Sequence, residues 1–552
     1  MNLLKVCAFA LLSGAIITAD GAQKRPMVLQ IMWDGMRADC LENCHLPNLR
    51  RLAEGRWMKG YNGAWSYCSR PIEDARPYSY ANHASHLNGV TAAKHGVYYN
   101  HETINCRAKE WPAWPTRLLD AQPQKKVVFY FTSGVAYHLC PDKRVEMKNM
   151  RHDEVGKASD LSARYSGDQA PDVAILFIDD PDGQGHANGF FPVSANYRKA
   201  VEANDVQLGK ILDAIASRKT FDDEDWLILM AADHGGYKNM HGWLDDHSRT
   251  APMVIAGRGV INGQMYGFPR GVDLPPTALA HFGIDTSRMN LDGQAVGTRR
   301  ATWCAASKLS DALTWYYPVA AKTKELVNFA PKGPGSDVIG DKEYFNPLCT
   351  GDAIFKTPYL LVAGAEDVLC AARLHDSAEH FIAPRPAFTI SFWARLRNFE
   401  GNPVIFGNKD LSREGTPGFV LCQGGRTERA PKGVAVVYGT PHGRDVTVGT
   451  FDIEFGKWTY YALVGTSEGH LWLCQGRSDG MFHWICAKAD NALLGSGLPL
   501  HIGQDGRGGW KWNFGDSLDD IAIWKRSLTI QEIKQIYLAG RDKKELKDIC
   551  FK

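Results

Sequence analysis

Apolar and polar positions along the first half of the chain follow the pattern of an α/β domain. Five short runs are apolar on both faces, as buried strands of a mainly parallel sheet are, and they lie at 27–35, 126–134, 172–180, 225–235 and 251–257. Residues 194–219 place apolar side chains at helical spacing, in one stripe suited to face a sheet. We therefore expect a mainly parallel sheet sandwiched by helices.

After Asn328 the pattern changes to that of an all-β fold. A stretch at 330–341 is rich in Pro and Gly and predicts a linker. Beyond it, short runs of strand length are separated by Gly, Asn and Asp turns, which is typical of an antiparallel sandwich. We expect no helix there before Thr529, where Glu532 completes the pattern of a capping box.

The first 22 residues have the pattern of a secretory signal peptide. Lys5 precedes an apolar run that ends at Ile17, and the small residues Ala19 and Gly21 suit the positions before a cleavage site. The run is shorter than the roughly 20 residues of a membrane-spanning helix, and no later stretch is long and charge-free enough to span. We expect a secreted protein, periplasmic or extracellular, without a transmembrane anchor.

Cysteine content and charge narrow the class of protein further. Removal of Cys7 with the signal would leave an even number of the 13 cysteines, which in an exported chain favours disulfides. Cys40 and Cys44 lack a second Cys/His pair at zinc-finger spacing, so we prefer a disulfide there. The formal net charge of +2 excludes a polybasic nucleic-acid binder, and the 11% aromatic content excludes a disordered chain.

Side chains of metal-ligand type follow several of the predicted strands. Ligands gather at the carboxyl ends of parallel strands, and six such residues stand there or in the loop beyond: Asp34, Asp182, His186, Asp233, His234 and His241. Taken singly, each is better explained by a strand-end turn. Together, three carboxylates and three imidazoles suffice for two divalent ions, with zinc preferred and manganese as the alternative.

The segment 75–96 offers a nucleophile for such a site. Ser79 and Ser85 stand in it, interleaved with Asn82 and His83. A serine at a helix N-terminus gains from the positive end of the helix dipole, and a metal lowers the pKa of its hydroxyl. Ser79 is equally suited to be an ordinary N-cap, so the residues alone leave the nucleophile open.

Taken together, these motifs resemble the alkaline phosphatase superfamily, and within it the type I phosphodiesterases and nucleotide pyrophosphatases. The resemblance covers roughly residues 25–300 through WDGMRAD, SYANH, DPDGQGHANG, ADHGG followed by HG, and DLPPTALAHFGI with LDGQAV. It implies one metal held by Asp34, Ser79, Asp233 and His234, and a second held by Asp182, His186 and His241.

The same resemblance assigns the catalytic residues. Aligning SYANH with the family's T-F-P-N-H selects Ser79 over Ser85 as the nucleophile and directs the Asn82 amide at a substrate oxygen. The spacing of the His-Gly pair selects His241 over His247. Ala81 and His83 stand where sulfatases carry Pro and Arg, which disfavours sulfate esters.

The resemblance implies a secreted two-metal phosphodiesterase that acts through a phosphoserine intermediate on Ser79. Its substrate would be a phosphate-ester small molecule or a phosphorylated glycan or lipid headgroup, and nucleic-acid binding is not expected. A phosphomonoesterase, a phosphoethanolamine transferase or a sulfatase-like hydrolase on the same site are alternatives. An alternative of another class is a glycan-binding adhesion protein with an inactive hydrolase-like domain.

The C-terminal part resembles the laminin-G-like, concanavalin A-like jelly roll through FTISFWARL, WTYYALV and LDDIAIWKRSLT. This resemblance implies a sandwich that could contact glycans, although Trp393, Trp458 and Trp524 suit a core better than a sugar platform. Asp519 and Asp520 suit either calcium or a turn. The expected division is a signal peptide at 1–22, a hydrolase domain at 23–328, a linker at 329–344 and a jelly roll at 345–552.

Overall fold

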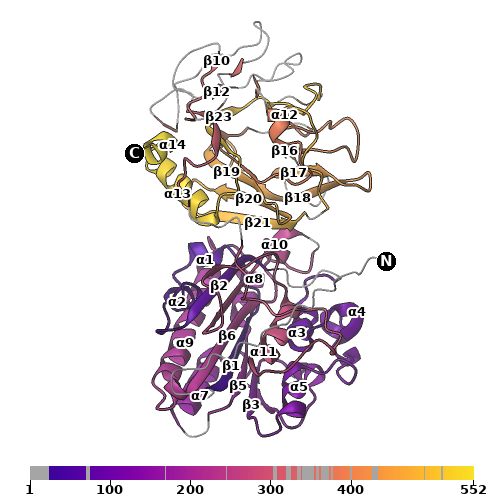
Figure 1. Ribbon diagram of the computed structural model, residues 1–552, viewed down its shortest axis with the longest axis vertical. Helices are drawn as coiled ribbons and strands as arrows, with labels where there is room; N and C mark the ends of the chain where they lie inside the picture. The colour runs from indigo at the N-terminus through magenta and orange to yellow at the C-terminus, as the bar shows by residue number, and fades with distance from the viewer. Residues whose placement is uncertain are drawn as a thin grey trace, which may run out of the picture.

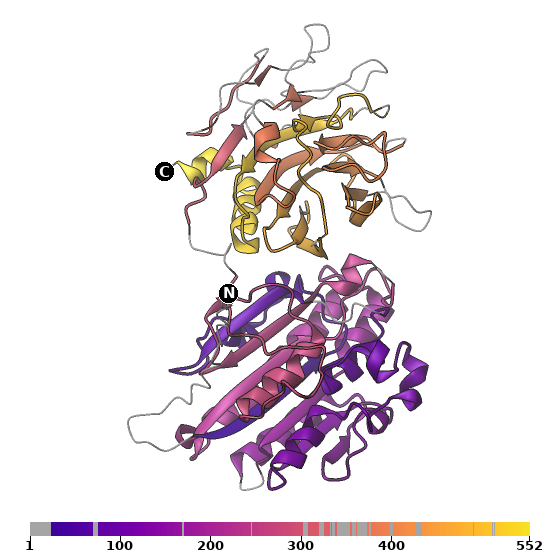
Figure 2. The same cartoon turned by 45° about the vertical axis from the view of Figure 1, so that its right-hand side comes forward.

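The computed structural model has an α/β body and an all-β body that meet end to end (Figure 1, Figure 2). The predicted signal peptide and most of the predicted linker lie outside the residues that it describes. Those residues are 24–69, 75–167, 170–243, 245–301, 307–318, 325–331, 333, 337–338, 354–355, 360–361, 372–374, 377–397, 401–424, 433–489, 491–510, 512 and 514–551.

Within the described residues, an eight-stranded sheet in the order β4-β3-β5-β1-β6-β7-β2-β8 forms the centre of the first body. The strands are β1 Arg25–Trp33, β2 Asn62–Ser69, β3 Val127–Phe131, β4 Glu146–Asn149, β5 Val173–Ile178, β6 Glu224–Ala232, β7 Ala251–Gly257 and β8 Gly263–Gln264. β4, β3, β5, β1 and β6 are mutually parallel, whereas β7 pairs antiparallel with β6 and β2. The predicted mainly parallel sheet is confirmed, and all five apolar runs form strands in it.

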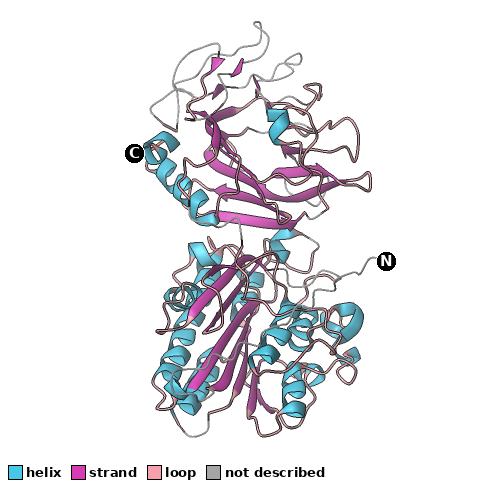
Figure 3. Ribbon diagram, in the orientation of Figure 1, coloured by secondary structure: helices cyan, strands magenta, loops and turns pink. Residues whose placement is uncertain are grey.

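Helices cover both faces of this sheet (Figure 3). In β1, Leu29 and Ile31 pack with α7 and α9 on one face, while Val28 and Met32 pack with α3, α5 and α11 on the other, because successive side chains of a strand alternate. The predicted helix at 194–219 is α9. The helices of this body are α1 Cys40–Asn43, α2 Pro47–Ala53, α3 Ser79–Asn88, α4 Ala92–His95, α5 Trp114–Ala121, α6 Ala136–Leu139, α7 Glu154–Ser166, α8 Asp180–Asn188, α9 Ala195–Ala216, α10 Asp246–Arg249 and α11 Leu274–His281, with 3₁₀ turns η1 Asn100–Asn105, η2 Phe221–Asp223 and η3 Gly271–Asp273.

The second body consists mainly of two antiparallel sheets around a common apolar core. One contains β12-β23-β14-β19-β20-β21 with β9 on β23, and the other contains β13-β22-β15-β16-β17-β18. The strands are β9 Leu313–Tyr317, β10 Glu325–Leu326, β11 Asp337–Val338, β12 Leu360–Leu361, β13 Ala372–Arg373, β14 Phe388–Arg395, β15 Val404–Gly407, β16 Phe419–Gln423, β17 Gly433–Gly439, β18 Asp445–Asp452, β19 Trp458–Gly465, β20 His470–Gly476, β21 Phe482–Lys488, β22 His501–Ile502 and β23 Ser517–Trp524. This arrangement is consistent with a sandwich, and its jelly-roll class stays a prediction.

Three details of the second body differ from the expectations or refine them. β9 pairs with β23 although it precedes the predicted linker. A one-turn helix, α12 Ser377–His380, comes before α13 Ile530–Arg541 and α14 Leu546–Cys550, whereas the predicted capping box of Thr529 and Glu532 is present at α13. Asp520 accepts hydrogen bonds from Tyr316 Oη at 2.7 Å and Leu546 N at 3.0 Å, so it caps α14.

The expected disulfides are not formed among the described cysteines, which are all thiols in the structure. This includes Cys40 and Cys44, for which a disulfide was expected. Their thiols lie close enough for a hydrogen bond, which with burial raises the pKa of Cys44. Of the three tryptophans expected in the core, Trp393 and Trp524 are buried and Trp458 is half-buried.

β21 forms the main contact of the second body with the first, close to α10 (Figure 1). Asn43 exchanges two hydrogen bonds with the backbone of Phe482, at 2.6 and 2.9 Å. Trp484 Nε1 donates to the carbonyl oxygen of Tyr67 at 3.2 Å. No helix of the described residues is both long and apolar enough to span a membrane.

Candidate metal centre

The predicted ligands come together at the carboxyl ends of three neighbouring strands. Asp34 follows β1, Asp233 and His234 follow β6, and Asp182 lies in the first turn of α8, which follows β5. Because β5, β1 and β6 are adjacent and parallel, their ends share one edge of the sheet. The strand order therefore brings residues that are about 50 to 200 positions apart into one site.

The first group of predicted ligands surrounds His234 Nε2. This nitrogen lies 3.2 Å from Asp34 Oδ1, 3.5 Å from Asp233 Oδ2 and 3.1 Å from Ser79 Oγ. All four side chains are buried. The four residues that the family resemblance assigns to one metal are therefore neighbours in the structure.

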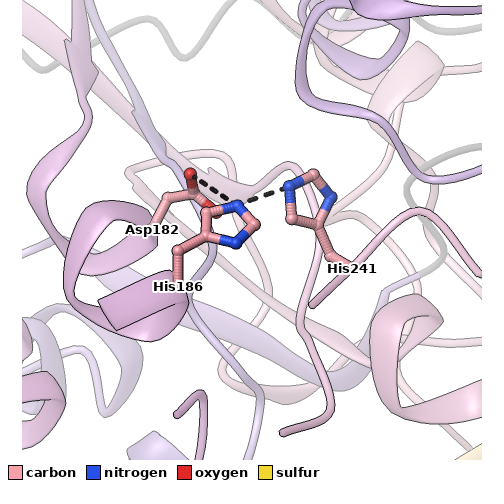
Figure 4. Close-up of side chains that lie close together, drawn as sticks. All are labelled: Asp182, His186 and His241. Carbon is pink, nitrogen blue, oxygen red and sulfur yellow. Dashed lines mark ion pairs between the residues drawn. The ribbon is translucent and has the colours of Figure 1, made fainter. Parts of the chain in front are cut away.

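The second group lies beside it, around Asp182 (Figure 4). Asp182 Oδ2 is 3.5 Å from His186 Nε2, and its Oδ1 is 3.6 Å from His241 Nε2. Asp182 Oδ1 also lies 3.9 Å from His234 Nε2 and so joins the two groups. Three sets of residues can each supply three ligand atoms within 4.8 Å of one another: Asp182, His186 and His241; Asp34, Asp182 and His234; and Asp34, His83 and Asp233.

The orientation of the imidazoles fits metal binding. In three of the histidines, Nδ1 faces a backbone carbonyl oxygen. His186 Nδ1 lies 2.9 Å from that of Asn239, His241 Nδ1 lies 3.0 Å from that of Pro77, and His234 Nδ1 lies 2.7 Å from that of Gly235. A carbonyl only accepts, so each Nδ1 carries a proton and Nε2 is the nitrogen that each ring turns toward the site carboxylates. Asp182 Oδ1 is buried and has no hydrogen-bond partner among the described residues.

Burial and neighbouring charges shift the pKa values of several side chains in the site. Burial raises the pKa of Asp182 to about 8, and the adjacent Asp34 carboxylate adds to this shift. Burial opposes the charge on His234, but Asp233 and Asp34 outweigh it and raise its pKa to about 10. Burial and His234 lower the pKa of His241 to about 3, which keeps this imidazole in the neutral form that metals bind.

Ser79 is the first residue of α3, and Tyr78 is its N-cap, with extended backbone. Because Tyr78 occupies the N-cap position, Ser79 is not the N-cap of this helix, and its hydroxyl lies 3.1 Å from His234 Nε2. The rival Ser85 has its hydroxyl 3.0 Å from His95 Nε2 instead. The rival ligand His247 has its Nδ1 3.3 Å from Arg37 Nη1, and His241 occupies the place beside Asp182.

Asn82 is buried one turn after Tyr78 on the same helix. Its Nδ2 donates to the carbonyl oxygen of Tyr78 at 3.2 Å, and its Oδ1 has no partner among the described residues. The expected contact of this amide with a substrate oxygen stays a prediction.

His83 belongs to the site, although it was not predicted as a site residue. Its Nε2 donates to Asp233 Oδ2 at 3.1 Å and lies 3.3 Å from Asp34 Oδ2. Burial opposes its charge, but these two carboxylates raise its pKa to about 9. The signal was its spacing, because four positions after Ser79 is the next turn on the same face of α3.

Comparisons with known proteins place the match in this first body. Residues 28–248 match the family model of type I phosphodiesterase / nucleotide pyrophosphatase. Venom phosphodiesterase 2 of Crotalus adamanteus is 26% identical over 249 residues, which cover 40% of this chain and 28% of the relative. Ectonucleotide pyrophosphatase/phosphodiesterase family member 3 of Bos taurus is 24% identical over 234 residues, 38% of this chain and 25% of the relative. The chain thus spans about a quarter of these relatives.

Solved structures resemble the chain more distantly. Murine ectonucleotide pyrophosphatase / phosphodiesterase 5 in complex with AMP has a TM-score of 0.37 and 13% identity, covering 47% of this chain and 96% of that chain. A 2-O GAG sulfatase has a TM-score of 0.37 and 14% identity, covering 49% and 73%. The family model and the curated relatives support the resemblance to the alkaline phosphatase superfamily for the first body.

Proposed function

We propose that the chain is a secreted, two-metal phosphodiesterase whose nucleophile is Ser79. The observation that carries this proposal is the position of Ser79 Oγ at the start of α3, 3.1 Å from His234 Nε2 and within the ring of predicted metal ligands. Asp34, Asp233 and His234 would hold one divalent ion, and Asp182, His186 and His241 the other. Mixed carboxylate and imidazole ligands favour zinc, with manganese as the alternative.

The two ions, when bound, would neutralise charge on the phosphate oxygens and lower the pKa of the Ser79 hydroxyl. Ser79 Oγ, its proton lost to solvent, then attacks the phosphorus, the bond to one alcohol breaks, and that alcohol takes up a proton as it leaves. The phosphoserine that forms keeps the second alcohol as its ester, and water cleaves its bond to Ser79 Oγ, which restores the hydroxyl and releases the phosphomonoester. Ser79 lies at the N-terminus of α3, where the positive end of the helix dipole favours the negative charge that develops, and Asn82 would add a side-chain donor.

The test is Ser79→Ala, assayed on a nitrophenyl phosphodiester. We expect turnover to fall by about 10³-fold or more, because the bond-forming atom is removed, while elemental analysis finds the metal content unchanged. Ser85→Ala is the matched control on the same helix, since its hydroxyl faces His95. Undiminished turnover in Ser79→Ala would exclude Ser79 as the nucleophile.

The alternatives on the same site differ in the substrate that they prefer. A nitrophenyl phosphomonoester and a nitrophenyl sulfate, assayed beside the diester, separate a phosphomonoesterase and a sulfatase from the proposed diesterase. Transfer of phosphate to an added alcohol would identify a transferase. Fewer than one metal ion per chain after gentle purification would favour the glycan-binding alternative with an inactive first domain.

A further inference from the structure

The turn formed by residues 237–240 adjoins two ligands of the second proposed metal, His186 and His241, and we call it the ligand turn. Tyr237 and Met240 close it with backbone hydrogen bonds of 2.9 and 3.1 Å. Asn239 holds His186 at both ends, because its carbonyl oxygen accepts from His186 Nδ1 at 2.9 Å and its Nδ2 donates to the His186 carbonyl at 3.0 Å. His241 follows directly, so two of the three ligands depend on the position of this turn.

On its other side, the ligand turn contacts the end of β18 in the all-β body. Tyr237 Oη donates to Asp452 Oδ1 at 2.8 Å. The Tyr237 ring stacks on His247 with centroids 4.7 Å apart, and His247 in turn packs against Phe451 at 5.2 Å. Asp246 Oδ2, in the same loop, accepts from Gly449 N at 3.0 Å.

The side chains of the ligand turn are largely exposed, so burial contributes little to its stability. Residues 238–240 are exposed, and the Met240 side chain is 51% exposed. Within the first body the turn is also held by the hydrogen bond from Phe190 N to the Lys238 carbonyl oxygen, at 2.7 Å, and by packing of the Tyr237 ring against Phe191, with centroids 5.5 Å apart. Segments with few buried contacts open most readily, so the contacts with β18 restrict a segment that would otherwise move.

We propose that the all-β body positions ligands of the second metal site. Asp452 and Phe451 hold the ligand turn in place, so that His186 and His241 present Nε2 to one ion. Tyr237 is the positioning residue that transmits this contact. Groups that orient metal ligands from outside typically change metal affinity 10- to 100-fold when they are removed. The proposal rests on the two-metal site of the proposed function.

The experiment measures zinc binding to the full chain in chelator-buffered solutions, with elemental analysis at each free concentration. Tyr237→Ala removes both the stacking and the hydrogen bond, and we expect roughly 10- to 100-fold weaker binding of one of the two ions. Tyr237→Phe removes the donor and Asp452→Ala removes the acceptor of the exposed hydrogen bond, and each should weaken the same ion by roughly three- to tenfold. Asp452→Glu, which keeps the acceptor, should recover most of that loss.

Lys534→Met is the matched control at the same interface. It removes the 2.9 Å ion pair between Lys534 Nζ and Glu42 Oε2, which is remote from the ligand turn, and should leave both zinc affinities unchanged. Two tightly bound ions in every Tyr237 and Asp452 variant would overturn this inference and leave the proposed function standing. A wild-type chain that binds no zinc would instead overturn the proposed function, and thermal unfolding of each variant identifies any that misfold.

Discussion

At the scale of single residues, the centre brings buried carboxylates close together, and burial with the Asp34 charge raises the pKa of Asp182 to about 8. Three carboxylates, from Asp34, Asp182 and Asp233, converge there around His234. His83, which lies on α3, contacts two of these carboxylates, those of Asp34 and Asp233. Its ring donates to a carboxylate that would bind the first metal, which is the usual way that a protein fixes a ligand's orientation.

We therefore expect His83→Ala to weaken binding of the first ion by about 10- to 100-fold, because Asp233 Oδ2 loses the donor that orients it. His83→Gln should recover part of this affinity through its amide donor. Titration with zinc against a competing chelator measures both variants. His86→Leu changes a buried histidine on the same helix that bonds neither carboxylate, and equal losses in His86→Leu and His83→Ala would show that only helix packing had been disturbed.

At the scale of elements, the sequence predicted what continuous burial dictates. The five apolar runs became strands, and the apolar stripe at 194–219 became α9, since burial on both faces or on one helical stripe leaves a periodic signal. β9 was missed because its pairing with β23 joins residues about 200 positions apart. In the site, the ligands that follow strands were predicted, whereas His83 was not, although it lies one turn after the predicted Ser79 on α3.

Gly35 is the element-scale feature on which the geometry of the site depends. It turns the chain after β1 with φ of +70°, and a Cβ there would lie 2.8 Å from Asp182 Cα. Gly35→Ala should displace α8 and its ligand Asp182, so we expect weaker metal binding and a loss of about 1–3 kcal/mol in the free energy of unfolding. Chemical denaturation and zinc titration measure the two effects.

Gly183→Ala is the control, because Gly183 is next to Asp182 in α8 and a Cβ there meets nothing within 4 Å. In a helix this change should be neutral or stabilise by up to about 1 kcal/mol. If Gly35→Ala bound zinc as tightly as Gly183→Ala does, the close approach of β1 and α8 would not be what positions Asp182.

At the scale of the whole molecule, the two bodies share a buried charged network at the carboxyl edge of the sheet. Arg37 donates to both oxygens of Asp39 at 3.0 and 2.7 Å, and Asp39 Oδ2 lies 2.7 Å from His483 Nδ1 in β21. Arg37 also donates to the Gly236 carbonyl oxygen at 2.5 Å and lies over the Phe191 ring. The loops that follow the strands and adjoin the predicted metal ligands therefore also contribute to the interface between the two bodies.

The chain's formal net charge of +2 bears on how a phosphate ester would be attracted to the site. A nearly neutral protein offers little long-range attraction for a phosphate ester. In the proposed function, attraction would therefore come from the bound ions themselves. The ligand turn contacts both His186 and β18, so docking of the second body and capture of the substrate would be linked through the same few residues.

Asp39 makes the docking of the two bodies dependent on pH. Burial alone would raise its pKa, but Arg37 and His483 outweigh burial and hold it well below its ordinary value. The folded state therefore binds fewer protons than the unfolded state, so the carboxylate stabilises the fold above its unfolded pKa of about 3.9 and loses this contribution as the pH falls below that value. At pH 7, Asp39→Asn leaves Arg37 buried without its counter-ion, and we expect a loss of about 3–5 kcal/mol.

Urea unfolding of wild type and Asp39→Asn at pH 7 and at pH 3.5 tests this prediction. The gap between the two proteins should be wide at pH 7 and begin to narrow at pH 3.5, because the wild-type carboxylate then starts to lose its contribution. Asp213→Asn, which removes the exposed ion pair with Arg51, should shift stability by no more than about 1 kcal/mol at pH 7. A gap that stays equally wide at both pH values would mean that the Asp39 charge does not stabilise the docked bodies.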